Sequence, residues 1–249
     1  MPDPRRDLAP WVVVVPVLDE ALALPKLLAE FQAEPGLLER ALFVDNGSRD
    51  GSRELLLARG ATVVEELRRG YGYACLTGAG AALARGAGAV VFMEGDGSDD
   101  PRDLPLLVEP VLRGEADLMI GVRGHAAHGM PGGMPAHQRL GNRLAAAGLR
   151  LLFGLEVPDN GPFRAIDGDL LRRLAMEARP FAWTTEMLVK AHLAGARIAF
   201  VETRYRPRAG RSKIAGTARG TIGAFGGIFL TMLRLWLQGS TVTGRRLAG

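Results

Sequence analysis

Short apolar runs rich in β-branched residues alternate along the chain with segments in which apolar residues recur every three or four positions. The first pattern predicts buried strands and the second predicts amphipathic helices. The predicted strands are residues 11–15, 41–44, 61–65, 89–93, 117–122 and 198–205. The predicted helices are residues 21–31, a segment starting near 52, a small-residue segment ending near 84, and residues 104–112, 136–153, 168–176 and 186–193. This alternation predicts an α/β fold with a mostly parallel central sheet flanked by helices.

Several helix boundaries are predicted from the residues that stand there. Pro101 is expected to open a helix, because its missing N–H costs nothing at the first helical position. Ser52 is expected to cap the helix that starts near it, and Thr184 or Thr185 the helix over residues 186–193. Residues 159–164 are expected to form a turn.

A last apolar segment, residues 221–237, is interrupted by Arg234 and lies at the lower length limit for crossing a bilayer. We expect it to be an interfacial helix, with Trp236 and the arginines at the level of the lipid headgroups. A packed core helix or a dimer contact accounts for the pattern equally well. The expected division is therefore one domain over residues 1–214 and an amphipathic helix with a tail over residues 215–249.

Polar residues follow three of the first four strands. The sequence reads Pro-Val-Leu-Asp-Glu at residues 16–20, Asp-Asn-Gly-Ser at 45–48 and Glu-Gly-Asp at 94–96. Because parallel strands end at the same edge of a sheet, these residues should gather where open α/β sheets bind ligands. Carboxylates spaced two residues apart suit a hard cation that also holds phosphate oxygens. Taken alone, residues 94–100 fit an acidic surface loop as well as they fit a cation site.

Other polar features carry weaker signals. The basic loop over residues 206–213 indicates an anion site or a solvated loop with similar weight. Gly70 and Gly72 follow a strand, but Cys75 stands where a dinucleotide-binding fingerprint has its third glycine. His125 and His128 lie in a glycine-rich segment and are expected to be solvated rather than metal ligands.

Composition narrows the class of protein. With 47% hydrophobic residues, 23% charged residues and a net charge of +4, the chain is typical of a globular protein, and we expect no nucleic-acid partner. Cys75 is the only cysteine, which excludes an intramolecular disulfide and a cysteine-based zinc site and fits a reducing compartment. Residues 1–10 do not resemble a signal peptide, so we expect a cytoplasmic protein.

Taken in order, the polar stretches resemble family 2 glycosyltransferases of the GT-A fold, from about Trp11 to Leu237. Residues 16–20 are similar to the family's Pro-x-x-Asn-Glu, with Asp19 in place of Asn. Residues 45–52 are similar to Asp-Asp-Gly-Ser-x-Asp-Gly-Ser/Thr, with Asn46 in place of the second Asp. Residues 70–74 are similar to Gly-x-Gly-x-Ala. Glu94-Gly95-Asp96 stands at the Asp-x-Asp motif, with Glu94 in place of the first Asp.

Later stretches resemble the branch that contains dolichol-phosphate mannosyltransferases and bacterial polyprenyl-phosphate glycosyltransferases. Residues 121–123 are similar to the Gly-Ser-Arg of this branch, and residues 139–142 to its Arg-x-x-Gly-Asn region. Residues 161–164 are similar to Gly-Phe-Arg with Pro162 inserted. Residues 208–213 are similar to the Arg-x-x-Gly-x-Ser-Lys segment that helps to bind phosphate.

The resemblance implies an inverting, metal-dependent transfer of a hexose from a nucleoside-diphosphate sugar to a polyprenyl phosphate. Asp96 and Glu94 would hold Mg²⁺ or Mn²⁺, and Asp96 and Glu186 are the candidate catalytic residues. The implied donor-binding residues are Pro16, Leu18, Glu20, Asp45, Gly47, Ser48, Gly70, Gly72, Glu94, Gly95 and Asp96. The implied residues around the acceptor phosphate are Arg123, Arg139, Arg208, Arg211, Ser212 and Lys213.

The partners implied are the sugar donor, the lipid acceptor and the cytoplasmic face of a membrane, on which the protein would be peripheral. If the apolar segment over residues 221–237 forms a dimer contact, the protein is a homo-oligomer. One alternative is a glycosyltransferase for a small phosphorylated or hydroxyl acceptor, in which Glu186 would be the base that a hydroxyl needs. A second alternative is a module that binds a nucleotide sugar without catalysis.

Overall fold

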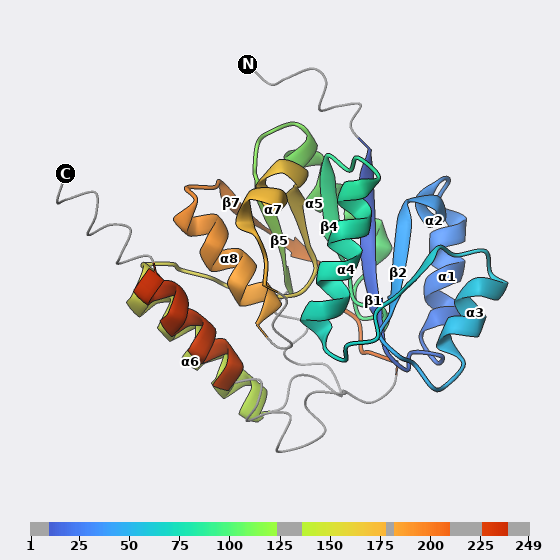
Figure 1. Ribbon diagram of the computed structural model, residues 1–249, viewed down its shortest axis with the longest axis horizontal. Coiled ribbons are helices and arrows are strands. Elements are labelled where there is room, and N and C mark those ends of the chain that lie inside the picture. Colours follow the sequence, from blue (N-terminus) through green and yellow to red (C-terminus); the bar gives the residue numbers. More distant parts are fainter. Residues whose placement is uncertain (1–9, 124–135, 178–181, 210–225, 239–249) are drawn as a thin grey trace.

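Seven strands form one sheet in the order β3-β2-β1-β4-β6-β5-β7 (Figure 1). This computed structural model describes residues 10–123, 136–177, 182–209 and 226–238, without the side chains of 136–142, and all statements below concern these residues. The strands are β1 (Trp11–Val17), β2 (Ala41–Asp45), β3 (Val63–Glu65), β4 (Ala89–Phe92), β5 (Leu118–Arg123), β6 (Arg164–Asp167) and β7 (Ile198–Thr203). Strands β1 to β4 are mutually parallel, as predicted, and β5 is parallel to β7.

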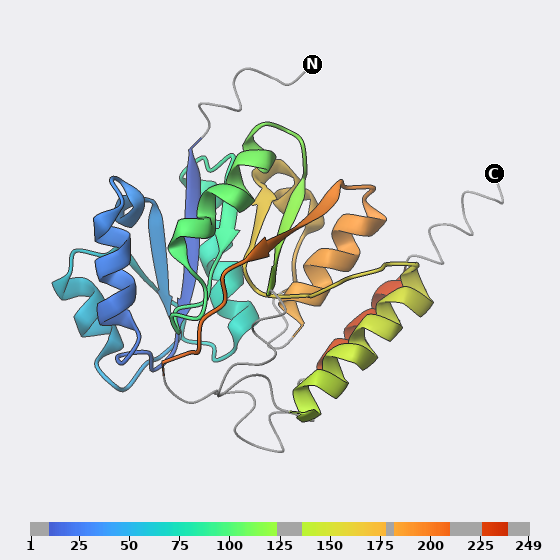
Figure 2. The same ribbon diagram turned by 180° about the vertical axis from the view of Figure 1, so that it is seen from behind.

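Helices cover both faces of the sheet (Figures 1 and 2). On one face lie α1 (Leu24–Ala33), α2 (Leu37–Arg40), α3 (Ser52–Ala58) and α5 (Leu104–Leu112), the last entered through a 3₁₀ turn at Pro101–Asp103. On the other lie α4 (Tyr71–Ala84), α7 (Gly168–Leu174) and α8 (Trp183–Leu193). Alternate residues of β1 enter the two cores, Val12 and Val14 on one side and Val13 and Val15 on the other, because successive strand side chains point to opposite faces.

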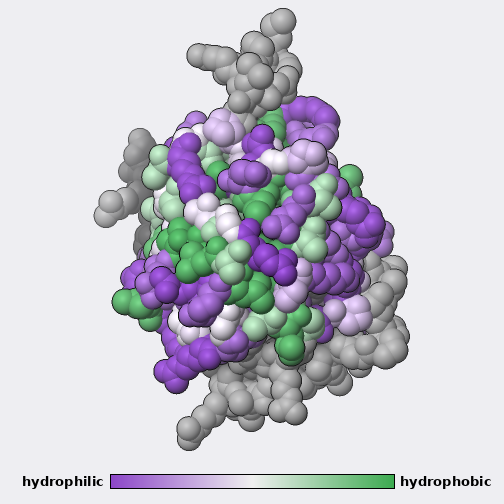
Figure 3. All heavy atoms as spheres, turned by 90° about the vertical axis from the view of Figure 1, so that its right-hand side faces the viewer, coloured by the Kyte–Doolittle hydropathy of each residue, from purple (hydrophilic) through white to green (hydrophobic). Residues whose placement is uncertain are grey.

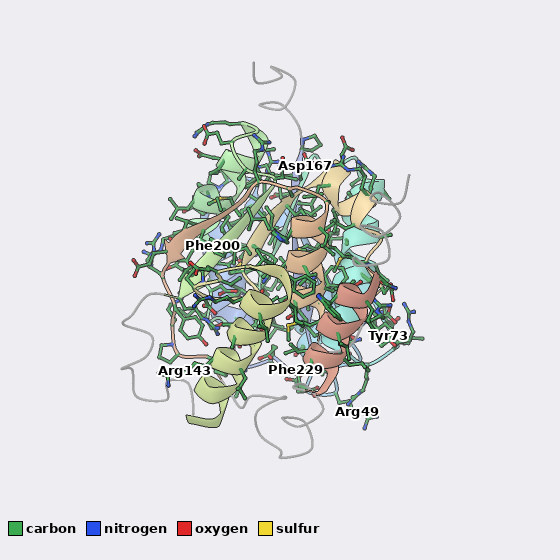
Figure 4. All side chains as sticks on the ribbon, turned by 90° about the vertical axis from the view of Figure 1, so that its left-hand side faces the viewer. Arg49, Tyr73, Arg143, Asp167, Phe200 and Phe229 are labelled. Atoms are coloured by element: carbon green, nitrogen blue, oxygen red, sulfur yellow. The ribbon has the colours of Figure 1, made fainter. Side chains whose placement is uncertain are left out.

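Helix α6 (Ala136–Phe153) and a helix over residues 226–238 lie side by side beyond α8, and we call them the outer helix pair (Figure 4). They approach closely, because a Cβ added to Gly148 would lie 3.1 Å from the Met232 methyl carbon. Met232 and Leu235 are buried in the same core as α8. The inner face of the last helix is therefore packed, and the expected boundary between residues 214 and 215 lies outside the described residues.

Strand β6 was not predicted, because the sequence indicated a turn over residues 159–164. It is antiparallel to both of its neighbours, and Arg164 pairs with Phe92 on β4 and with Ile120 on β5. The Arg164 side chain is completely buried, and its guanidinium donates to the carbonyl oxygens of Gly161 and Thr184 and to Asn160 Oδ1. The charge of Arg164 and the nearby Gly-Pro pair concealed this strand, because the sequence does not show that a buried guanidinium here finds hydrogen-bond acceptors.

Two predicted capping residues are wrong. Gly51, with a φ of 89°, precedes α3, and Ser52 is its first residue. The Ser52 hydroxyl accepts from the backbone N–H of Glu20 at 2.8 Å and donates to Asp50 Oδ1, so it serves a neighbouring loop. Helix α8 begins at Trp183, so Thr184 and Thr185 lie inside it and the capping position is Ala182, without a side-chain cap; Thr185 Oγ1 accepts from Asn160 Nδ2.

The two ends of the molecule differ. Figure 3 faces the end with α1, α2 and α3, where hydrophilic side chains surround smaller apolar patches. The outer helix pair lies at the opposite end (Figure 1). Among the helices of the described residues, none has both the length and the apolar character needed to cross a bilayer.

Candidate functional site

The loops after β1 and β2 are bound together at the edge where these strands end, the lower edge in Figure 1. The backbone N–H of Asp19 donates to Ser48 Oγ at 3.1 Å, and the N–H of Arg49 donates to Asp19 Oδ1 at 2.7 Å. Asp19 has a φ of 53°, a left-handed conformation that aspartate and asparagine adopt more readily than other residues with a Cβ. The predicted gathering of these polar residues at one edge is confirmed.

Asn46 ties the loop after β2 to the loop over residues 66–70 and to the end of β1. Its amide nitrogen donates to the carbonyl oxygens of Glu66 and Arg68, both at 2.8 Å, and its Oδ1 accepts from the N–H of Gly70 at 2.8 Å. Its own backbone N–H donates to the carbonyl of Val17. Only an amide offers both donors and an acceptor here, so the side chain holds the turn that opens α4.

The other residues expected to bind the donor lie around this centre. Asp45 is buried, and its Oδ1 accepts from the N–H of Ser48. Gly47 has a φ of 83°, which favours glycine. Gly70 precedes α4, and Gly72 is buried in its first turn. Pro16 is the penultimate residue of β1 and lies opposite Val44, and Leu18 and Glu20 follow the strand, half-buried. The structure therefore brings all of them to the edge where β1, β2 and β4 end.

The Glu94-Gly95-Asp96 stretch follows β4 and lies against β1. A Cβ on Gly95 would lie 2.9 Å from the carbonyl oxygen of Pro16, so only glycine lets the two backbones approach this closely. The N–H of Glu94 donates to Asp99 Oδ2 at 3.0 Å, and Asp96 Oδ1 accepts from the N–H of Ser98 at 3.0 Å. The close approach at Gly95 thus fixes the backbone that carries both acidic residues.

Three carboxylates crowd this turn. Burial raises the pKa of Glu94, and the charges of Asp96 and Asp99 raise it further. Burial likewise raises the pKa of Asp99, with a further contribution from Asp96 and an opposing one from its hydrogen bond to the N–H of Glu94. Like charges at short range in a partly dry site disfavour full ionisation. The site therefore favours the arrival of positive charge.

A segment after β7 supplies such charge, and we call residues 204–209 the basic strap. Figure 2 shows it in orange, running along the lower edge of the sheet. Its backbone is fixed by hydrogen bonds from the N–H of Arg204 to Asp103 Oδ2, from the N–H of Arg206 to the carbonyl of Ser98 at 2.8 Å, and from the N–H of Ala209 to the carbonyl of Asp96 at 3.1 Å. Arg208 Nη2 lies 3.1 Å from Asp96 Oδ2 and 3.9 Å from Glu94 Oε2.

Arg123, expected near an acceptor phosphate, ends β5 and forms a two-pronged pair with Asp159. Its Nε and Nη2 each lie 2.7 Å from a carboxylate oxygen of Asp159. Its guanidinium also lies 5.5 Å from the ring centre of Tyr205 on the strap. Arg123 is therefore held beside the strap but already has an anionic partner.

Several residues predicted to bind the acceptor phosphate lie outside the part of the chain whose side chains the structure describes. The Arg139 side chain, Arg211, Ser212 and Lys213 fall outside the residues whose side chains the structure describes, as do His125 and His128. Their predicted roles stay predictions.

Glu186 is fully buried in the first turn of α8. Its Oε1 accepts from Lys190 Nζ at 2.7 Å and from the backbone N–H of Glu177 at 2.9 Å. Glu177 in turn pairs with Arg234 of the outer helix pair. Arg234, expected at headgroup level, thus forms an ion pair within the protein. The partners of Glu186 come from α8 and the segment after α7, not from the loops that carry Glu94 and Asp96.

The carboxylate pair suits a divalent cation. Glu94 and Asp96 already share one cationic group, the guanidinium of Arg208, which shows that their oxygens converge. In the described part of the chain, no three acidic, histidine or cysteine side chains form a metal cage. Two carboxylates leave coordination positions for phosphate oxygens of a ligand, which is the usual arrangement for Mg²⁺.

Sequence reasoning missed several residues that shape the site. Asp159 pairs with Arg123, Glu30 on α1 binds Arg206 at 2.6 Å, and Asp103 binds Arg204. The excess of arginine in residues 204–208 was the available signal for an ionic network. Its acidic partners were hidden, because they come from a helix and turns distant in sequence.

The sequence comparisons give three findings. Residues 12–174 match the sequence model of the family described as Glycosyl transferase family 2. An uncharacterized glycosyltransferase of Mycobacterium tuberculosis is 37% identical over 211 residues, which cover 84% of this chain and 92% of the relative. The undecaprenyl-phosphate mannosyltransferase of Micrococcus luteus is 30% identical over 221 residues, which cover 82% of this chain and 87% of the relative.

The structural comparison concerns the fold. Glucosyl-3-phosphoglycerate synthase from Mycobacterium tuberculosis, solved with Mn²⁺, UDP-glucose and phosphoglyceric acid, superposes with a TM-score of 0.71. The sequences are 21% identical, and the alignment covers 91% of this chain and 81% of the other. The GT-A fold expected from the sequence is therefore confirmed.

Proposed function

Because the chain belongs to glycosyl transferase family 2, and is therefore a glycosyltransferase, we propose that it transfers a hexose from a nucleoside-diphosphate sugar to a polyprenyl phosphate, with inversion. The observation that carries this proposal is the meeting of the Glu94–Asp96 pair with the basic strap at one edge of the sheet. A cation held by the acidic pair would bind the donor diphosphate, and the arginines of the strap would bind an anionic acceptor.

In the proposed reaction, an oxygen of the acceptor phosphate attacks the anomeric carbon from the side opposite the diphosphate. A new carbon–oxygen bond forms as the bond to the leaving diphosphate breaks, which inverts the configuration. A Mg²⁺ or Mn²⁺ ion held by Asp96 and Glu94 would offset the charge that develops on the leaving group. A phosphate is anionic near neutral pH, so this attack requires no base from the protein.

The chain's own residues then have positioning tasks. The loops after β1 and β2, held by Asn46 and Ser48, would shape the nucleotide pocket together with Asp45 and the turn at Gly70. Arg208 and Arg123 would orient the acceptor phosphate beside the sugar, where a fixed near-attack geometry lowers the barrier. We also propose that Arg139, Arg211, Ser212 and Lys213 contribute to this phosphate site.

Two observations support a lipid acceptor. The Micrococcus luteus relative is named for transfer to undecaprenyl phosphate. In addition, the last helix presents an apolar stripe to the outside, with side chains between 41% and 59% exposed, formed by Phe229, Leu230, Leu233, Trp236 and Leu237. Residues at these spacings share one face of a helix, so the stripe suits the surface of a bilayer. A peripheral position on the cytoplasmic face of a membrane follows as part of the proposal.

The test is sugar transfer from radiolabelled UDP- and GDP-sugars, with Mg²⁺ or Mn²⁺, into polyprenyl phosphate in an organic extract. Wild-type protein should label the lipid, and Asp96→Asn should reduce transfer at least a hundredfold while the protein remains folded. Full activity of that variant would contradict the metal assignment. Label found only in water-soluble products would indicate a small acceptor in place of the lipid, such as the phosphoglyceric acid bound by the structural neighbour.

A further inference from the structure

The arginines of the basic strap have unequal partners. Arg204 donates from its backbone N–H and from Nε to the Asp103 carboxylate, at 2.6 and 2.8 Å. Arg206 is fixed by both oxygens of Glu30, at 2.6 and 3.0 Å, and by the carbonyl of Asp99 at 2.8 Å. Each of these two has an acidic partner outside the Glu94–Asp96 pair, so they serve to fasten the strap.

Arg208 differs from both, since its ion-pair partners are Asp96 and Glu94 themselves. The guanidinium binds at the oxygens that a divalent cation would need, Asp96 Oδ2 above all. Two cations at this one position would repel each other strongly in a partly dry site. Binding of the metal and the observed position of Arg208 therefore exclude each other.

The strap lets the side chain move without loss of its anchor. The hydrogen bond from Ala209 to the carbonyl of Asp96 holds the neighbouring backbone, and the Arg208 side chain is about one-third exposed, at 34%. Its long stem allows the guanidinium to leave the carboxylates while the backbone stays in place. A guanidinium released at this point would remain near Tyr205, whose ring Arg123 also contacts, and could bind an anion.

We propose that Arg208 is a resident counter-ion of the Glu94–Asp96 pair that a divalent cation displaces, and that the displaced guanidinium then binds the anionic group of the second substrate. The carboxylates are thus neutralised in both states, first by the arginine and then by the metal. The second step rests on the proposed function, because it requires an acceptor with a phosphate. The binding of metal and of acceptor phosphate would be coupled positively and reciprocally.

The first test measures Mn²⁺ binding to the whole chain, without sugar donor or lipid, from the electron paramagnetic resonance signal of free Mn²⁺. Arg208→Gln should bind Mn²⁺ on the order of tenfold more tightly than wild type, because the competing cation is removed. Arg208→Lys should lie between the two. Arg102→Gln is the matched control, since it removes the same charge from a residue paired with Asp100 nearby and should change affinity less than about twofold.

Equal or weaker Mn²⁺ binding in Arg208→Gln would overturn the inference, and so would equal tightening in Arg102→Gln, which would indicate a general charge effect. Absence of Mn²⁺ binding in every variant would overturn it together with the metal part of the proposed function.

The second test adds inorganic phosphate as the probe for the acceptor group. Phosphate should tighten Mn²⁺ binding severalfold in wild type, and this gain should disappear in Arg208→Gln. The same gain in both proteins would overturn the second step. These measurements need no glycosyl transfer, so a failure here is separate from a failure of the transfer assay.

Discussion

Replacing Asn46 by aspartate would bring the chain into line with the Asp-Asp-Gly-Ser pattern of the family it belongs to, yet we expect the change to destabilise this protein. The Asn46 amide donates two hydrogen bonds to the carbonyl oxygens of Glu66 and Arg68 and accepts one from Gly70, all at 2.8 Å. A carboxylate keeps the bond from Gly70 but places an anion against two carbonyl oxygens.

The magnitude follows from these contacts. Each lost hydrogen bond costs about 1 kcal/mol, and a buried carbonyl without its donor costs about 1–3 kcal/mol. Asn46 is buried, so water does not substitute easily. The free energy of unfolding should therefore fall by about 3–5 kcal/mol at pH 7.5.

The pH dependence has a definite sign. The site disfavours the ionised form of the introduced aspartate, so its pKa in the folded protein should be above the ordinary value of about 3.9. The destabilisation should therefore be small below that pH, grow as the pH rises towards the folded-state pKa, and be complete above it. Asn46→Ala, which loses all three hydrogen bonds but introduces no charge, should lose about 3–5 kcal/mol independently of pH.

Urea denaturation of the three proteins between pH 4 and pH 8 provides the measurement. A free energy of unfolding of Asn46→Asp within about 1 kcal/mol of the wild-type value at pH 7.5 would refute the reasoning, because the carbonyl oxygens of Glu66 and Arg68 would then have other donors.

Three further predictions concern packing, acid stability and membrane contact. Gly78→Ala should lower the free energy of unfolding by about 2–3 kcal/mol in urea denaturation, because its Cβ would lie 2.2 Å from Val14 Cγ1. An unchanged free energy of unfolding would mean that α4 can shift away from the sheet at no cost. Hydrogen bonds from Arg68 hold the pKa of Glu66 at about 2, so Glu66→Gln should be less stable than wild type at pH 7. That difference should diminish in acid melts as the pH falls from about 4.5 towards 2, and a constant difference would exclude the carboxylate as its source. Leu233→Glu should reduce flotation with anionic vesicles about fivefold and leave the melting temperature within about 2 °C, whereas equal loss in the exposed control Leu57→Glu would point to nonspecific binding.

Much of the fold was predictable because its signals are local. The apolar runs of β1, β2 and β4 and the helix periods of α5 and α6 lie within single stretches of sequence, and the structure has them within a few residues of the predicted ends. Parallel strands end at one edge of a sheet, so the placement of Asp45, Glu94 and Asp96 along the same edge followed from the predicted strand directions.

The remainder depended on distant partners. Arg164 appeared to be a turn residue, and only the fold shows that its backbone pairs with β4 and β5 while its buried guanidinium reaches the carbonyl of Thr184 on α8. Arg206 meets Glu30 across 176 positions, and Arg123 meets Asp159 across 36. Ser52 was expected to cap its own helix but instead accepts from Glu20, 32 positions away. No local pattern specifies which of many charged or hydroxyl groups a side chain will meet.

The sequence by itself determined the α/β class, the family, the acidic turn after β4 and the apolar character of the last helix, because each depends on residues that are close together in the sequence. Only the tertiary structure decided that Asn46 ties the loop after β2 to residues 66–70, that Arg206 pairs with Glu30, and that Arg208 lies on the Glu94–Asp96 pair. The physical reason is that hydrogen bonds and ion pairs are selected by distance in space. That distance is set by the packing of helices on both faces of the sheet rather than by position along the chain.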